Sequence, residues 1–266
     1  MPERPLILIT NDDGIDSPGL RALERPLARL GEVWVVAPSR ERSTSSHSLS
    51  LGGPVLLTRC GPRRWSVGGT PADATFVAVF SVLPRRPALV VSGINCGPNL
   101  GTDVIYSGTV AAAREAAMRG IPAMAVSLTG GRTYGRAASV AVRVARSLLA
   151  ERLPRTRDGR GLLVNVNVPP RSAGRIRLTR LGHRHYPENI ERACLPFGRT
   201  YVWLGLGPIR SEDSDGTDTA AIARGDASVT LLAIDQTLPE ARAAFPALAE
   251  RLERAAKPVR KEGRRR

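Results

Sequence analysis

Cysteine, histidine, lysine and aromatic residues are all scarce in this chain of 266 residues. The cysteines, Cys60, Cys96 and Cys194, are odd in number and widely spaced, which argues against a disulfide framework. Aromatic residues make up only 4% of the chain, so valine, leucine, isoleucine and alanine must fill the interior. The apolar fraction of 42% is that of a globular protein with one substantial core.

Several familiar sequence signals are also missing. No apolar run approaches the roughly 18 to 20 residues of a membrane span, and the N-terminal stretch has no small-residue cleavage site. We therefore expect a cytoplasmic protein with no membrane partner. The sequence contains no GxxxxGK[ST] motif, and the first predicted strand is not followed by GxGxxG. A P-loop ATPase and a dinucleotide oxidoreductase are both disfavoured.

The charge of the chain is strongly positive, at +15. Arginine supplies 37 of the 39 basic residues, because Lys257 and Lys261 are the only lysines. Such a bias is more typical of codon composition than of a selected binding face. Residues 251–266 carry eight positive and two negative charges, so +6 of the total lies in a basic tail that we predict to be partly disordered. A nucleic-acid-binding protein on an α/β scaffold remains the alternative, and the tail is the reason to keep it.

The order of the predicted elements indicates a doubly wound α/β fold. Apolar runs typical of parallel strands alternate with segments that carry helix caps. The predicted strands are 6–11, 32–38, 88–95, 122–128 and 162–169. A small hairpin is predicted around Gly61 and Pro62. Helices are predicted after Ser17, after Thr70, over 107–119 and over 137–153. We therefore expect a Rossmann-like, mostly parallel sheet over residues 1–174.

The alternation of predicted strands and helices ends at about residue 175. Three further strands are predicted within 175–181, 200–207 and 228–234, and a final helix over 239–256. The polar segment 209–221 is predicted to be a mobile loop. We assign residues 175–250 to a C-terminal antiparallel extension that serves as an oligomerisation arm.

Two adjacent carboxylates, Asp12 and Asp13, follow the first predicted strand. Ligands bind beyond the carboxyl ends of strands in open α/β sheets, where Ser43 and Asn95 are also expected to lie. Neighbouring carboxylates at a buried strand end repel each other, and a hard divalent cation with oxygen ligands would offset both charges. We predict a magnesium or manganese site; the alternative is an ordinary Asp-Asp-Gly turn.

The predicted helix that follows the third central strand begins with Ser107, Gly108 and Thr109. Unpaired amides and the positive dipole end of a helix favour an anion there, and the hydroxyls could add contacts to a phosphate. The alternative is that Ser107 or Thr109 only caps the helix. A metal beside a phosphate-binding helix start is the arrangement for phosphoester hydrolysis.

Histidine offers one candidate acid or base. His47 follows the second predicted strand in the segment RSTSSHSLS and could reach the site. Its alternative is a solvated or structural role. His183 and His185, in GHRHY, are disfavoured as a metal pair because no third ligand is nearby.

Four long segments of the chain resemble the SurE family of metal-dependent nucleotidases. They are ILITNDDGIDSPGL, VVAPSRERSTSSHS, GTPADATFVAV and VVSGINCGPNLGTDVIYSGTVAAAREAAMRGIPAMAVS, which cover most of residues 6–128. One departure is Thr44, where many relatives have glycine directly after the serine that corresponds to Ser43.

The resemblance implies a phosphomonoesterase acting on nucleoside 5′- and 3′-monophosphates, with some activity on short polyphosphate. It implies one divalent ion (Mg²⁺ or Mn²⁺) per subunit. We expect that ion to activate a water for in-line attack, although Asp12 or Asp13 could instead act as base or nucleophile. It further implies a Rossmann-like core whose C-terminal hairpin is exchanged in homodimers or tetramers. The site residues implied are Asp12, Asp13, Ser43 and Asn95 for the metal, and Ser107, Gly108 and Thr109, with Asn99 nearby, for phosphate.

Overall fold

The structure is a computed structural model that describes residues 3–150, 160–171, 175–205, 207–237 and 244–255. The chain divides into two compact units, Met1–Ile234 and Asp235–Arg266. The second unit contains helix α7 (Pro246–Ala255), within the range where the final helix is predicted. The predicted disorder of the basic tail concerns 251–266, of which 256–266 lie outside the described residues.

A nine-stranded mixed sheet forms the centre of the first unit, in the order β3-β4-β2-β1-β5-β6-β7-β13-β8. The strands β4, β2, β1, β5, β6 and β7 run parallel to one another, whereas β3 is antiparallel to β4. The fold is therefore the α/β class that the alternation predicts. The strands are β1 (Leu6–Thr10), β2 (Glu32–Pro38), β3 (Leu57–Gly61), β4 (Arg64–Val67), β5 (Leu89–Cys96), β6 (Ala123–Leu128), β7 (Leu163–Val168), β8 (Ile176–Thr179) and β13 (Ala227–Leu232).

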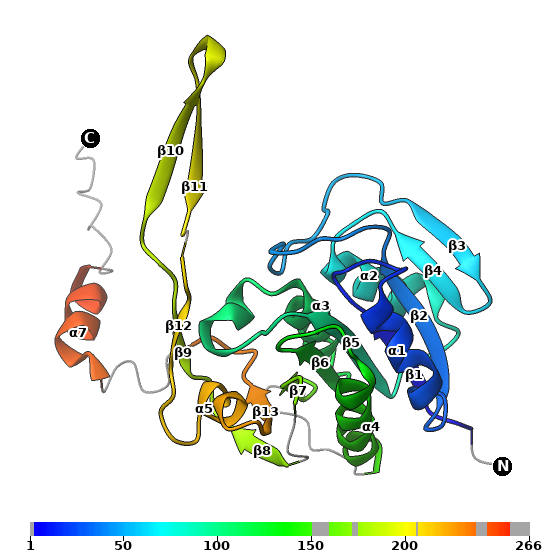
Figure 1. The fold of residues 1–266 in the computed structure, drawn as a ribbon. Coiled ribbons are helices and arrows are strands. Elements are labelled where there is room, and N and C mark those ends of the chain that lie inside the picture. The colour runs from blue at the N-terminus through cyan, green and yellow to red at the C-terminus, as the bar shows by residue number, and fades with distance from the viewer. Residues whose placement is uncertain (1–2, 151–159, 172–174, 206, 238–243, 256–266) are drawn as a thin grey trace, which may run out of the picture. The chain divides into compact units, whose positions relative to one another are not determined.

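Helices cover both faces of this sheet (Figure 1). Helices α1 (Pro18–Leu27) and α4 (Gly135–Ala150) pack against one apolar cluster, and α2 (Pro71–Val77) and α3 (Gly108–Met118) pack against the other. Because both faces are covered, β1 is buried at every position, as expected for a central parallel strand. Short helical turns, η1 (Ala78–Val82) and η2 (Gly101–Ile105), follow α2 and precede α3.

Local sequence signals fix where the helices begin. Ser17 accepts a hydrogen bond from the Leu20 amide and is followed by a proline, which together start α1. Helix α2 begins with a capping box between Thr70 and Asp73. These starts are the ones that the sequence predicts.

The C-terminal region differs in part from the predicted antiparallel extension. Strand β13 is antiparallel to β7 but joins the main sheet, and it pairs in parallel with β8, so the sheet continues beyond residue 174. Ala227, Ser228 and Thr230 on β13 are buried, which makes it an interior strand of the sheet. The assignment of separate roles to residues 1–174 and 175–250 stays a prediction.

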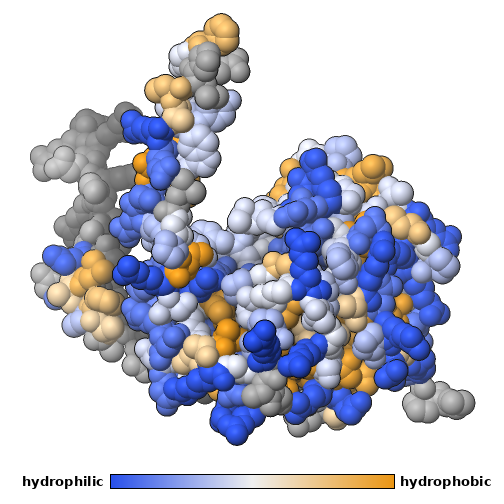
Figure 2. All heavy atoms as spheres, in the orientation of Figure 1, coloured by the Kyte–Doolittle hydropathy of each residue, from blue (hydrophilic) through white to orange (hydrophobic). Residues whose placement is uncertain are grey.

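Two small antiparallel pairs complete the extension. Strand β9 (His183–His185) pairs with β12 (Arg210–Glu212), and β10 (Ile190–Leu195) pairs with β11 (Arg199–Leu204) through the turn η3 (Pro196–Gly198). The β10–β11 hairpin projects away from the main sheet (Figure 1). Figure 2 shows hydrophobic residues at its far end, where Phe197 is fully exposed.

The prediction of a mobile loop over 209–221 is wrong. This segment contains β12 and the start of α5 (Asp218–Ala223), which Thr217 caps. The buried Asp218 carboxylate accepts hydrogen bonds from the amides of Gly101 (2.9 Å) and Gly182 (2.8 Å), so this polar segment is anchored in the interior.

Among the helices that the structure describes, none has the length and apolarity needed to cross a membrane.

Candidate active site

Most of the predicted site residues line one cavity of about 610 Å³ beyond the carboxyl ends of β1 and β5. Strand β2 leads into the same region, so residues far apart in the sequence meet here because parallel neighbouring strands end at one edge of the sheet. His47 and Thr109 are not among the lining residues. The predicted residues that line the cavity are Asp12, Asp13, Ser43, Asn95, Asn99, Ser107 and Gly108.

The turn after β1 is held in shape by the buried side chain of Asn11. Its Nδ2 donates to the Gly14 carbonyl (3.0 Å) and to Ser17 Oγ (2.7 Å), while its Oδ1 accepts from the Gly14 amide (3.2 Å). Gly14 has φ of +98°, a backbone conformation that favours glycine. Asn11 therefore ties β1, the turn and the start of α1 into one rigid support for the two aspartates.

The surroundings of Asp12 and Asp13 disfavour two negative charges. Asp12 is only 5% exposed, and burial raises its pKa, although the hydrogen bond from Thr109 opposes this shift. Burial, followed by the charges of Asp12 and Glu41, raises the pKa of Asp13 to about 6. A bound cation would favour the ionised form of both carboxylates. The electrostatics thus support the predicted cation site.

Ser43 and Thr44 lie on the exposed loop after β2. Ser43 Oγ donates to Glu41 Oε1 (2.6 Å), and the Arg42 amide donates to the Asp12 carbonyl (2.8 Å), which ties this loop to the end of β1. Thr44 has φ of +56°, in the left-handed region. The residue that departs from the family's glycine therefore adopts the conformation for which glycine is favoured.

Asn95 and Asn99 project from the end of β5 and the loop after it. Asn95 Nδ2 donates to the Gly97 carbonyl (2.9 Å), so its Oδ1 is the atom that can serve as a metal ligand. Asn99 is buried, and its Nδ2 donates to Ser127 Oγ (2.7 Å). Its carbonyl accepts from the side chains of Asn165 and Asn167 on β7. The alternation of asparagine with valine in this apolar strand is the sequence signal for that support, and our sequence analysis missed it.

Ser107 and Gly108 form the start of α3. Ser107 Oγ accepts a hydrogen bond from the Val110 amide (3.1 Å), so the capping role is present. Ser107 also lines the cavity, where its hydroxyl hydrogen can be donated to an anion. A Cβ added to Gly108 would lie 2.9 Å from Asp12 Cβ and 3.1 Å from Pro71 Cγ. Only glycine allows this helix start to approach Asp12 so closely.

Thr109 lies against Asp12 and is not among the residues that line the cavity. It is fully buried, and its Oγ1 donates to Asp12 Oδ1 at 2.5 Å. The side chain therefore connects the predicted phosphate-binding helix to the predicted metal-binding carboxylate. A phosphate contact through its hydroxyl stays a prediction, as does one through its backbone amide.

His47 points to a buried carboxylate on α3. Its Nε2 lies 2.8 Å from Glu115 Oε2, and Glu115 also pairs with Arg119. The Ser46 side chain and amide donate to the carbonyls of Ile105 and Tyr106, and the Thr70 hydroxyl donates to the Ser48 carbonyl, so the loop is anchored on both sides of His47. The contact with Glu115 fits the structural role that we named as the alternative for His47. An acid or base role for His47 stays a prediction.

Arg184 is a cavity residue that our sequence analysis missed. It lies between His183 and His185, which we considered and set aside, and its side chain is only 12% exposed. It forms an ion pair with the buried Asp103, whose other oxygen accepts from the Tyr186 hydroxyl (2.6 Å). A buried ion pair gives no pattern along the sequence, because its two partners lie 81 residues apart.

The residues present fit a hard divalent cation. Asp12 and Asp13 offer two carboxylates, and Asn95 and Ser43 offer neutral oxygens, the donor set that magnesium and manganese accept. Within the described part of the chain, no group of three or more histidine, cysteine, aspartate or glutamate residues could hold a metal.

The fold and the cavity together define a doubly wound α/β protein with an acidic, oxygen-lined site next to a helix start. The family profile described as "Survival protein SurE" matches residues 7–188. The chain belongs to the SurE family.

Curated relatives and a solved structure match nearly the whole chain. The 5′-nucleotidase SurE of Pelobacter propionicus is 47% identical over 237 residues, covering 87% of this chain and 94% of the relative. That of Sorangium cellulosum is 46% identical, with 87% and 91% covered. The crystal structure of the SurE protein from Aquifex aeolicus has a TM-score of 0.79 and 36% identity, covering 92% of this chain and all of that one.

Proposed function

We propose that this protein is a metal-dependent 5′-nucleotidase that hydrolyses nucleoside monophosphates to nucleoside and phosphate. One observation carries the proposal: Asp12, Asp13 and the start of α3 at Ser107 line the same cavity. Relatives more than 40% identical bear the name 5′-nucleotidase SurE, which supports the 5′ specificity. Hydrolysis of 3′-monophosphates and of short polyphosphate belongs to the same proposal and rests on the family resemblance.

Asp12, Asp13, Asn95 and Ser43 would hold one Mg²⁺ or Mn²⁺ per subunit. When bound, such an ion polarises a phosphate oxygen and makes a water a better nucleophile. Thr109 bonds to the Asp12 carboxylate, and Asn11 holds the turn that follows it, so this part of the site is preorganised before any ligand arrives.

The phosphate would lie at the start of α3. The first amides of a helix lack carbonyl partners within the helix and favour an anion. At this start the Val110 amide is bonded to Ser107 Oγ and the Thr109 amide to Asp12, so the Gly108 amide and the Ser107 hydroxyl are the donors proposed for the phosphate. Arg184, which Asp103 orients, brings a positive charge to the same cavity, where it can share the charge that develops on the phosphate oxygens. This chain's contribution is therefore to bind, orient and neutralise the phosphate.

We also propose a homodimer or tetramer assembled through the C-terminal arm. Strands β10 and β11 pair with each other and with no other strand among the described residues. The hairpin exposes Phe197, Trp203 and Leu204, and a second copy of the chain would bury such apolar residues.

The experiment that tests the function is a panel of nucleoside 5′- and 3′-monophosphates assayed for phosphate release with Mg²⁺, Mn²⁺ or EDTA. We expect release from AMP or GMP with either metal and none with EDTA. Release that persists in EDTA would contradict the metal site. Salt-dependent binding to nucleic acid without any phosphate release would instead support the alternative of a nucleic-acid-binding protein.

Replacing Thr109 tests whether its hydrogen bond positions Asp12. Thr109→Val keeps the shape of the side chain but removes the donor, and we expect kcat/KM for AMP to fall about 10- to 100-fold, as for loss of a hydrogen bond to a charged group. Thr109→Ser, which retains the hydroxyl, is the matched control and should stay within about threefold of wild type. Equal losses in both variants would show that packing, rather than the hydrogen bond, matters at this position.

A further inference from the structure

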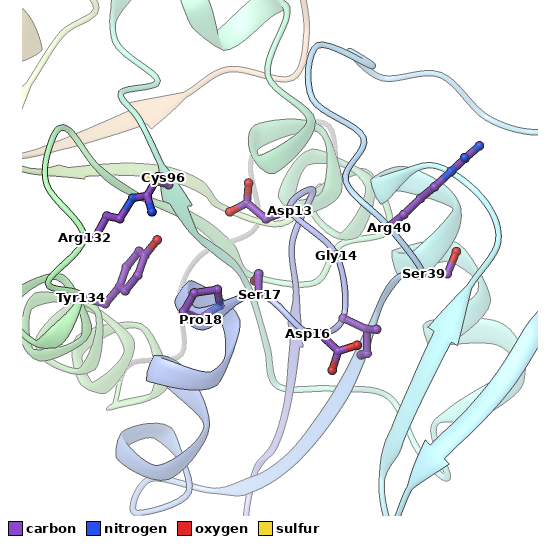
Figure 3. A pocket seen from close by; sticks show the side chains of 11 residues that line it. Asp13, Gly14, Asp16, Ser17, Pro18, Ser39, Arg40, Cys96, Arg132 and Tyr134 are labelled. Carbon is purple, nitrogen blue, oxygen red and sulfur yellow. The ribbon is translucent and has the colours of Figure 1, made fainter.

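A second cavity, of about 590 Å³, lies directly beside the candidate active site (Figure 3). Asp13, Cys96 and Arg132 line both cavities. A phosphate ester bound at the Asp13 end of the active site therefore has the second cavity within reach of its leaving group. The volume falls within the range of about 300 to 1,000 Å³ that is usual for small-molecule sites.

The two cavities differ in the chemistry of their lining. The active site is lined largely by carboxylate, amide and hydroxyl groups, whereas Ile15, Pro18 and the ring of Tyr134 contribute apolar surface to the second cavity. In Figure 3, Tyr134 lies with Arg132 and Cys96 on one side of the cavity. A flat apolar group is a suitable ligand for this surface, because its face can stack on an aromatic ring.

Tyr134 is held by the body of the protein rather than by a loose loop. Its side chain is half-buried and packs against the apolar cluster beneath α1 and α4. Its carbonyl accepts a hydrogen bond from the Ala138 amide (2.9 Å), which connects it to the first turn of α4. An aromatic ring on a rigid element gives a stacking surface that loses little conformational entropy when a ligand binds.

Arg132 gives the junction between the cavities a positive charge. It is exposed and is the one cation that lines both cavities in the described part of the chain. In a nucleoside monophosphate, the ester oxygen joins a charged phosphate to a largely neutral nucleoside. The change from a polar cavity to a partly apolar one, with a guanidinium between them, matches that distribution of charge.

Several residues line the active-site cavity but not the second cavity. Among them, Arg184 and the Tyr186 hydroxyl are both bound to Asp103. Tyr106 is the remaining aromatic side chain there, and it is 60% exposed. It provides a comparison for Tyr134, because Tyr106 lines only the active-site cavity and Tyr134 lines only the second cavity.

We propose that the cavity lined by Tyr134, Pro18 and Arg132 is the nucleoside subsite of this enzyme, with the base stacked on Tyr134 while the phosphate occupies the cavity of Asp12 and Ser107. The inference rests on the proposed nucleotidase function and adds where the nucleoside binds. It makes Tyr134 a residue that distinguishes nucleotides from other phosphate esters. Inorganic phosphate needs only the active-site cavity and should not respond to this residue.

The test compares Tyr134→Ala, Tyr134→Phe and Tyr106→Ala in the full-length, metal-loaded protein. We measure the KM for AMP and the inhibition constant of inorganic phosphate for each variant. We expect Tyr134→Ala to raise the KM for AMP about tenfold, in line with the loss of a base-stacking ring, and to leave phosphate inhibition within about twofold. Tyr134→Phe should keep the wild-type KM for AMP. In Tyr106→Ala, the ratio of the KM for AMP to the inhibition constant of phosphate should equal that of the wild type.

Three outcomes would overturn the subsite. They are an unchanged KM for AMP in Tyr134→Ala, an equal change in the KM and in phosphate inhibition, or a selective loss in Tyr106→Ala instead. Failure of the function itself is separate, since it means that the wild-type protein releases no phosphate from any nucleoside monophosphate. In that case adenosine binding, measured by calorimetry on the wild type and Tyr134→Ala, still tests the subsite, and equal affinities would overturn it.

Discussion

Asp12→Asn and Asp13→Asn are each expected to reduce phosphate release by about 1,000-fold or more, since each would remove a charged ligand from the proposed catalytic cation. Asparagine can still accept the hydrogen bond from Thr109 at position 12. Burial raises the pKa of Asp12, so a neutral side chain there does not oppose folding. The variants should therefore be folded but inactive. Phosphate release and thermal unfolding with and without Mn²⁺ are the measurements.

The control is Asp215→Asn, which lies outside the lining of both cavities. The Asp215 side chain is 87% exposed and pairs with Arg224 at the surface, so activity should stay within about twofold. Mn²⁺ should raise the unfolding temperature of the wild type and of Asp215→Asn but not of Asp12→Asn, because a ligand stabilises only a protein that binds it. If Asp12→Asn retained most of the wild-type rate of phosphate release, the metal site proposed here would be refuted.

Gly19→Ala is expected to lower the free energy of unfolding by about 3 kcal/mol, which is a large effect for one methyl group. An added Cβ would lie 1.9 Å from the carbonyl oxygen of Ile94 and 3.0 Å from its carbon. Both are backbone atoms of β5, so neither can move aside as the end of a side chain can. The start of α1 would have to separate from the strand that carries Asn95. Urea denaturation followed by circular dichroism measures the loss.

Gly135→Ala serves as the comparison for Gly19→Ala. Gly135 is also at the start of a helix, but no atom lies within 4 Å of an added Cβ. The free energy of unfolding of Gly135→Ala should stay within about 1 kcal/mol of the wild-type value or rise slightly, because alanine is the better helix former. Equal stabilities of the two variants would mean that α1 and β5 can adjust without cost.

The sequence predicted most of the central sheet and the helices around it. The buried strands are short apolar runs, and the helix starts at Ser17 and Thr70 depend on neighbouring residues alone, so both leave a local signal. The same is true of the turn around Asp12 and Asp13. The predicted place of these residues at the edge of the sheet followed from one general rule about parallel strands.

Contacts between distant segments could not be predicted in the same way. The partner of His47 is Glu115, which is 68 residues away, and the partner of Asp103 is Arg184. The polar segment after residue 209 reads as a loop, yet Asp218 is buried because two backbone amides elsewhere in the fold bond to it. Each of these depends on which segments the fold brings together, and periodicity does not report that.

The sequence by itself determined the α/β class, the two aspartates at a strand end and the helix start that follows β5, because hydrophobic period, capping residues and strand ends are properties of neighbouring residues. Only the tertiary structure decided that Thr109 bonds to Asp12, that Arg184 reaches the same cavity, and that a second cavity opens beside Asp13. Hydrogen bonds, ion pairs and cavities depend on distances between atoms that the chain order leaves open until the sheet and its helices have packed.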